Sequence, residues 1–106
     1  MIFYGNRVLV DPGQTVTLEV LVAMSARIRW LRVVGGPAVV ISAQHMQTQF
    51  LDSGCNGDGG GKRGLTRRAL AALRFDMPVV PGCPICVSVE SVGTRPATLG
   101  LVVEIA

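Results

Sequence analysis

The sequence predicts an all-β fold, namely a single antiparallel β-sandwich with jelly-roll or Greek-key connections and about seven to eight strands. Three observations support this prediction. Short apolar segments with a period of two recur along the 106 residues. Proline and glycine residues separate these segments at roughly even spacing, and no segment has the period of a long helix. We therefore expect one β-sandwich domain that spans residues 1–106.

Four strands are expected in the first half of the chain, at residues 7–10, 14–22, 27–34 and 38–45. The tripeptide Asp11-Pro12-Gly13 predicts a turn after the first strand, because proline presets φ and glycine accepts a positive φ. In the second strand Leu21 interrupts an otherwise polar face, which indicates that this face is not fully solvated. The fourth contains the run Val39-Val40-Ile41, which is typical of a strand covered on both faces.

Residues 52–64 contain six of the thirteen glycines, so we expect a flexible glycine-rich loop within the domain. After it, Thr66 is placed to cap a single helical turn over residues 67–70. A period of two then returns at Leu73, Phe75 and Met77, and Pro78 is expected to end that strand.

Residues 81–106 have the pattern of a β-hairpin. Apolar residues keep a period of two before and after a turn-forming segment at residues 91–96. The face predicted to be polar nevertheless carries Val102, which a lone sandwich would not need to expose.

The composition indicates contact with another chain. The sequence is 49% hydrophobic and 16% charged, whereas about 25% charged residues is usual. Polar side chains are therefore scarce for covering a small domain. The interface candidates are apolar residues on predicted outer faces and exposed arginines: Leu21, Arg27, Arg29, Arg32, Arg67, Arg68 and Val102.

No segment is predicted to span a membrane, because arginines interrupt the most hydrophobic region, at residues 27–32. The first residues lack the basic start and the cleavage site of a signal peptide, so synthesis in the cytoplasm is expected. Three cysteines are an odd number and cannot form a complete disulfide framework, which favours a reducing compartment.

The net charge of +3 is unevenly distributed, since residues 62–74 carry five positive charges and no acid. Phosphate binding is one interpretation of this segment. Because no aromatic residues are interleaved for base stacking, a solvated or interface-facing patch is favoured over specific nucleic-acid binding.

No catalytic residue, metal site or cofactor is predicted. The motif Cys83-Pro84-Ile85-Cys86 opens a predicted strand, whereas a redox pair needs a helix N-terminus. A zinc site would need Cys55 and His45 to complete four ligands, so structural cysteines are favoured. His45 has no nucleophile or orienting carboxylate placed by the sequence, and we expect it to be a hydrogen-bonded structural or surface residue.

Four segments carry a resemblance to a known class of proteins: residues 11–15, 27–34, 81–89 and 92–97. In strand and turn spacing they resemble small β-sandwich (jelly-roll-like) structural proteins of bacteriophage virions. The resemblance spans most of the chain, although the glycine loop and the Cys-x-x-Cys motif depart from it. It implies a coat, decoration or minor capsid role, built by symmetric repetition.

The predicted function is therefore a non-enzymatic structural subunit of a virus or phage particle. Its expected partners are copies of itself or a major capsid protein, and its expected location is the virion. Two alternatives remain open at this point. One is a metal- or ligand-binding β-module that uses Cys83, Cys86 and Cys55, and the other is a nucleic-acid-contacting protein that uses Arg63, Arg67 and Arg68.

Overall fold

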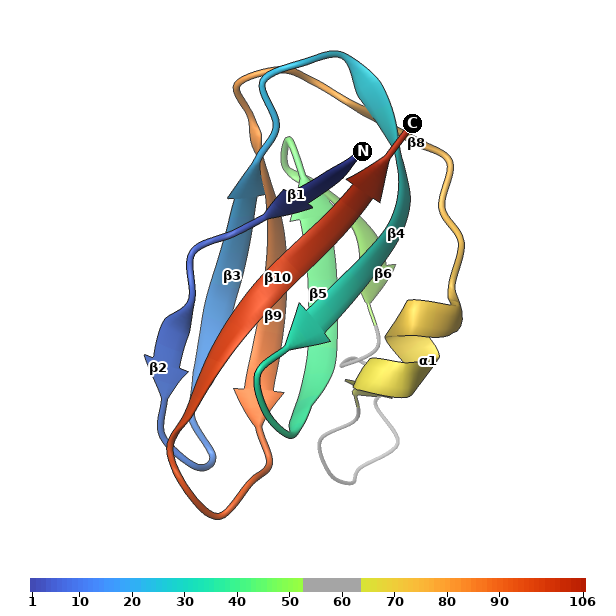
Figure 1. The fold of residues 1–106 in the computed structure, drawn as a ribbon. Coiled ribbons are helices and arrows are strands. Elements are labelled where there is room, and N and C mark those ends of the chain that lie inside the picture. Colours follow the sequence, from blue (N-terminus) through green and yellow to red (C-terminus); the bar gives the residue numbers. More distant parts are fainter. Residues whose placement is uncertain (53–63) are drawn as a thin grey trace.

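The computed structural model describes residues 1–52 and 64–106, and these form two antiparallel β-sheets packed face to face (Figure 1). We name each sheet after its long central strand. The β10 sheet consists, in order, of β1 (Ile2–Tyr4), β10 (Ala97–Ile105), β4 (Ala26–Val34) and β8 (Met77–Val79), and β2 (Val8–Val10) also pairs with β10. The β9 sheet consists of β3 (Thr15–Leu21), β9 (Pro84–Ser91), β5 (Ala38–His45) and β6 (Thr48–Asp52), and β7 (Leu65–Thr66) also pairs with β5. The predicted β-sandwich is confirmed.

The strand pairs follow the jelly-roll scheme. β1 and β2 pair with β10, β3 pairs with β9, β4 with β8, and β5 with β6, all antiparallel. The first half of the chain thus pairs in reverse order with the second half, and successive pairs alternate between the two sheets. The described residues form ten strands. Eight main strands remain when β1 and β2 are counted as one interrupted strand and the two-residue β7 is set aside.

The hairpin predicted for residues 81–106 is wrong. Both strands exist, but β9 lies between β3 and β5 in one sheet, and β10 lies between β1 and β4 in the other. Residues 92–96 therefore cross from one sheet to the other. Alternation of side chains determines which face of a strand is buried, but it does not identify the neighbouring strand.

The segment after the helix also differs from the prediction. Residues 73–76 are not a strand, although the Phe75 N–H donates to the Arg29 carbonyl at 2.8 Å. The strand β8 begins at Met77 and includes Pro78, which was expected to end it. Because β8 is an edge strand, a residue without an N–H donor is tolerated there.

The helix α1 (Arg67–Ala72) is longer than the single turn predicted, and its predicted cap is confirmed. The Thr66 hydroxyl oxygen accepts from the Ala69 N–H at 3.0 Å. Three strands, β1, β6 and the two-residue β7, were not predicted. In the predicted loop at residues 52–64, Asp52 is the last residue of β6, and residues 53–63 lie outside the described residues.

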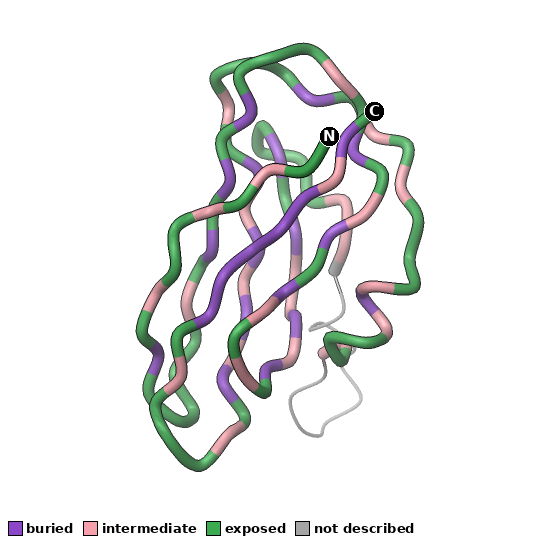
Figure 2. Tube along the Cα trace, in the orientation of Figure 1, coloured by how far each residue is buried: buried purple, intermediate pink, exposed green. Residues whose placement is uncertain are grey.

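The core lies between the two sheets and takes the inward-facing residues of both. Figure 2 shows buried residues running along most of β10. The largest fully buried side chains come from strands of both sheets and from α1: Leu18, Ile28, Leu31, Leu70, Ile85, Leu99 and Leu101. Burying each such side chain contributes roughly 1.5–3 kcal/mol to folding.

The two sides of the sandwich, where the edges of the sheets meet, are built differently. On one side α1 packs against β4 and buries Leu70 completely. Phe50 and Phe75 meet edge to face there, with ring centroids 5.4 Å apart. On the other side lie β1, β2 and β3, and no described helix covers them (Figure 1). No helix among residues 1–52 and 64–106 is long and apolar enough to cross a membrane.

Candidate protein interface

Exposed apolar side chains gather on the uncovered side of the sandwich. Among the described strands, all of the large hydrophobic residues that are exposed lie on β1, β2 and β3: Ile2 (46% exposed), Tyr4 (74%), Leu9 (67%) and Leu21 (61%). We call these four residues the edge patch. The other exposed hydrophobics, apart from Met1, lie in turns and connections: Met24, Met46, Leu73, Val80 and Val92.

The edge patch lies on strands that have a partner on one side only. β1 and β2 form one edge of the β10 sheet, and β3 forms one edge of the β9 sheet. Monomeric proteins usually protect such edges with charges, prolines or a covering helix. The sequences of β1 (IFY) and β2 (VLV) contain no charge and no proline. An apolar, uncovered edge of this kind is typical of a surface that contacts another protein.

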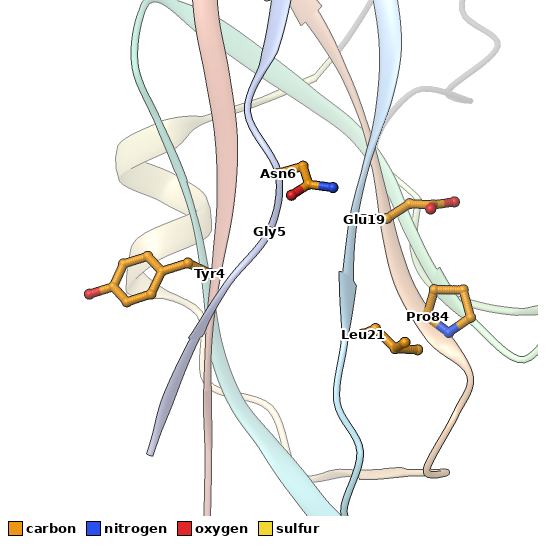
Figure 3. Close-up of a pocket in the computed structure, with 6 residues that line it drawn as sticks. All are labelled: Tyr4, Gly5, Asn6, Glu19, Leu21 and Pro84. Carbon is orange, nitrogen blue, oxygen red and sulfur yellow. The ribbon is translucent and has the colours of Figure 1, made fainter.

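A groove of about 480 Å³ joins the two edges (Figure 3). Its lining residues come from β1, the β1–β2 connection, β3 and β9: Tyr4, Gly5, Asn6, Glu19, Leu21 and Pro84. In Figure 3 the Asn6 side chain points toward β3, whereas the Tyr4 ring points away from it. Tyr4 and Leu21 therefore border the groove on opposite sides.

Gly5 allows the two sheet edges to approach each other. A Cβ atom on Gly5 would lie 2.2 Å from the Glu19 carbonyl oxygen, which is far inside van der Waals contact. The Gly5 N–H donates to the Leu101 carbonyl at 2.9 Å and so ties this connection to β10. The two edges thus form one continuous surface rather than two separate ones.

The polar groups of the groove are not arranged for acid–base chemistry. Glu19 is the only charged residue among those that line it. The neighbouring Cys86 thiol donates to Glu19 Oε2 at 3.7 Å. Burial raises the pKa of Cys86, and the negative charge of Glu19 raises it further. A thiol with a raised pKa carries little thiolate at neutral pH and is a weak nucleophile.

The predicted interface arginines lie apart from the edge patch. Arg27, Arg29 and Arg32 are exposed on β4, whereas Arg67 and Arg68 are exposed on α1, on the opposite side of the sandwich from β2 and β3. Of the seven predicted candidates, Leu21 alone belongs to the edge patch.

Two of these arginines have partners within the chain. Arg27 forms a salt bridge with the Asp76 carboxylate and also donates to the Asp76 carbonyl at 2.8 Å. The hydrogen bond from Arg27 to the Asp76 carboxylate and the positive charge of Arg27 lower the pKa of Asp76. The Arg32 guanidinium lies 4.4 Å from the centre of the Trp30 ring, in a cation–π contact.

The expectation that Val102 is exposed is wrong, because the side chain is only 7% exposed, whereas its place in an interface stays a prediction. Val102 does lie on the outer face of the β10 sheet, as predicted. It is directly opposite Tyr4 on β1 and Arg32 on β4. In a central strand, two long neighbours leave a short side chain little exposed surface, so Val102 belongs to the packing of this sheet.

His45 is a buried, hydrogen-bonded residue, as predicted. Its Nε2 accepts from the Val80 N–H at 2.9 Å, and its Nδ1 lies 3.2 Å from the Pro84 carbonyl oxygen. These two partners identify a neutral imidazole with the proton on Nδ1, which donates to Pro84. Both ring nitrogens are hydrogen-bonded to backbone groups, namely those of Val80 and Pro84. His45 therefore joins the end of β5 to the segment that runs from the end of β8 to the start of β9.

The cysteines of the Cys-x-x-Cys motif lie where β9 begins, and both are half-buried. No group of three or more potential metal ligands occurs in the part of the chain that the structure describes. Cys55, the third cysteine of the metal-binding hypothesis, is outside the described residues.

Ile2, Tyr4 and Leu9 were not predicted as interface residues from the sequence. β1 is only three residues long, so the period of a strand cannot be recognised in it. A strand was predicted at residues 7–10, but Val8, Leu9 and Val10 are all apolar, so the sequence does not show that Leu9 faces outward. The absence of charged residues at positions 1–5 was the signal in the sequence that could have identified Ile2 and Tyr4. Comparison with known proteins found no matching family model, no matching curated protein and no matching solved structure.

Proposed function

We propose that this chain is a non-enzymatic structural subunit of a virus or phage particle. It assembles with copies of itself, or with a major capsid protein, through the β1–β3 edge of the sandwich. The edge patch is the observation that carries this proposal, because it concentrates exposed apolar strand residues on the uncovered side of the molecule. The alternating strand pairs add support, since the jelly roll is an architecture of viral capsid proteins.

The size of the patch fits repeated assembly. Fully burying a large apolar side chain contributes roughly 1.5–3 kcal/mol, and part of this gain is lost to the entropy of association. A patch of four such residues therefore supports a weak pairwise contact. In a shell each subunit is held by several neighbours at once, so weak contacts combine into a stable particle.

The variant Leu21→Asp tests this edge. It places a charge on the β3 side of the patch, at a side chain that is exposed in the single chain, so the fold is preserved while association is weakened. We expect the dissociation constant for self-association, or for a major capsid protein, to rise by about tenfold or more. Analytical ultracentrifugation over a concentration series measures this change.

Val92→Asp is the matched control, because Val92 is an exposed hydrophobic residue in the connection between β9 and β10. It should associate as the wild-type chain does. Equal association of wild type and Leu21→Asp would overturn the proposed interface. A wild-type chain that stays monomeric and binds no capsid component would overturn the proposed function.

Electron microscopy of the assembled material tests the particle itself. Wild-type protein, alone or mixed with a major capsid protein, should form or decorate a closed shell with many copies of the chain. Irregular aggregates under both conditions would contradict a virion role.

A further inference from the structure

We propose that the end of the sandwich opposite the chain termini binds an oxyanion, in the form of a phosphate or carboxylate group. A hollow of about 530 Å³ lies there, between the β4–β5 connection, the β9–β10 connection and the segment before β2. Among the described residues that line it, those with a charge are Arg7 and Arg95. This inference is independent of the edge patch and concerns a different surface.

Neither arginine of the hollow has an acidic partner. Among residues 1–52 and 64–106 the one salt bridge joins Arg27 to Asp76, and neither of these residues lines the hollow. Asp11 follows Val10, which pairs with Ala97 at the border of the hollow, but Asp11 does not line it. Two guanidinium groups that share a hollow without a counter-charge repel each other, and an anion between them removes that repulsion.

The backbone of the β9–β10 connection offers further donors. The N–H groups of Gly93, Thr94 and Arg95 donate to no acceptor within the described part of the chain. These N–H groups are therefore available to an anion. The Thr94 hydroxyl lines the same hollow.

The stem of the exposed Arg7 packs against the strand beneath it. A Cβ atom on Gly100 would lie 3.3 Å from Arg7 Cγ and 3.9 Å from Arg7 Nε, so the arginine stem lies across this glycine. Gly100 is buried although it is on the outer face of the sheet. A stem fixed in this way loses less entropy when the guanidinium binds a ligand.

Glycines keep the wall of the hollow free of side chains. A Cβ atom on Gly35 would lie 1.8 Å from the Thr98 carbonyl oxygen, and one on Gly36 would lie 2.7 Å from the Ala97 Cβ. Gly35, Gly36 and Gly93 thus contribute only backbone to the lining of the hollow, and the two arginines supply the charge. Arginine binds phosphate and carboxylate groups through paired N–H donors, which favours an oxyanion over a spherical ion such as chloride.

The test is a titration of the ¹⁵N-labelled chain with inorganic phosphate and, separately, with acetate, at constant ionic strength set by chloride. We expect saturable shifts centred on the amides of residues 93–95. Arg7→Gln and Arg95→Gln should each weaken binding by about tenfold, as loss of one charge-assisted pair does. The spectra also report whether each variant is folded.

Arg68→Gln is the matched control, because Arg68 is an exposed arginine on α1, outside the hollow. It should bind as the wild type does. Saturation by phosphate but not by acetate identifies a phosphate site, and the reverse identifies a carboxylate site. The proposal is overturned if neither probe saturates, or if the three arginine variants lose affinity equally. Leu21→Asp should bind as the wild type does, so this test and that of the edge patch fail independently.

Discussion

Ser91 places a hydroxyl group inside the sandwich without a hydrogen-bond partner. The residue is buried, and its Oγ contacts no donor or acceptor among the described residues. Both backbone groups of Ser91 are hydrogen-bonded, because its N–H donates to the Gln14 carbonyl and its carbonyl accepts from the Gly13 N–H. The position is therefore needed for the β3–β9 pairing, whereas the hydroxyl is not.

Ser91→Ala should leave the free energy of unfolding unchanged or raise it by up to about 1 kcal/mol, because the variant removes a buried polar group that gains no hydrogen bond. Urea denaturation measures the change. The control is Ser88→Ala on the outer face, where the Ser88 Oγ lies 3.5 Å from Thr17 Oγ1. That variant should stay within about 0.5 kcal/mol of the wild type. A loss of more than about 1 kcal/mol in Ser91→Ala would mean that the hydroxyl has a partner in the folded protein.

At the scale of elements, the turn after β4 depends on one glycine. Gly35 has a φ of 109°, and it has no room for a Cβ atom because of the Thr98 carbonyl. Gly13, in the turn after β2, has a similar φ of 79° but nothing within 4 Å of its Cβ position. A comparison of the two positions therefore distinguishes the cost of a positive φ from the cost of steric overlap with a Cβ atom.

Gly13→Ala should lower the free energy of unfolding by about 1–2 kcal/mol, which is the cost of a left-handed conformation for an alanine. Gly35→Ala should lower it by about 1–3 kcal/mol more, because the backbone of β10 must move away from the new methyl group. Thermal and urea unfolding of both variants measure the difference. Equal losses in the two variants would show that the Gly35 turn relaxes freely.

Much of the strand content could be predicted from the sequence, because long strands carry a clear period of two. The strands β3, β4, β5, β9 and β10 lie within a few residues of their predicted ranges. β1 is too short to have a recognisable period, and the residues of β6 are mostly polar. Strand partners could not be predicted, because pairing in a jelly roll joins residues far apart in the sequence.

The candidate interface could be predicted only where one side chain broke a polar face, as Leu21 does. The exposure of Val102 could not be predicted in the same way, because it depends on Tyr4 and Arg32, which lie on two other strands. Burial on the outer face of a sheet is set by the size of such cross-strand neighbours.

At the scale of the whole molecule, the two outer faces differ in charge. β4 contributes Arg27, Arg29 and Arg32 to the β10 sheet, and Glu104 on β10 offsets one of these positive charges. The strands of the β9 sheet contain no lysine or arginine, and Glu19 and Glu90 lie on their outward-facing positions. A molecule with one basic and one acidic face has a preferred orientation when copies approach one another. This asymmetry is consistent with ordered assembly through the edge patch.

The same whole-chain pairing governs how the protein folds. Apart from the local β5–β6 pair, every main strand pair joins the first half of the chain to the second, and β1 pairs with the last strand. Large loops must close before such pairs become favourable, so we expect refolding on the order of milliseconds to seconds. Stopped-flow dilution from urea, followed by the fluorescence of Trp30, the single tryptophan, measures the rate. Leu21→Asp should refold at a similar rate, because its side chain is exposed in the folded chain. Refolding within microseconds would contradict this topology, since only locally paired folds reach that rate.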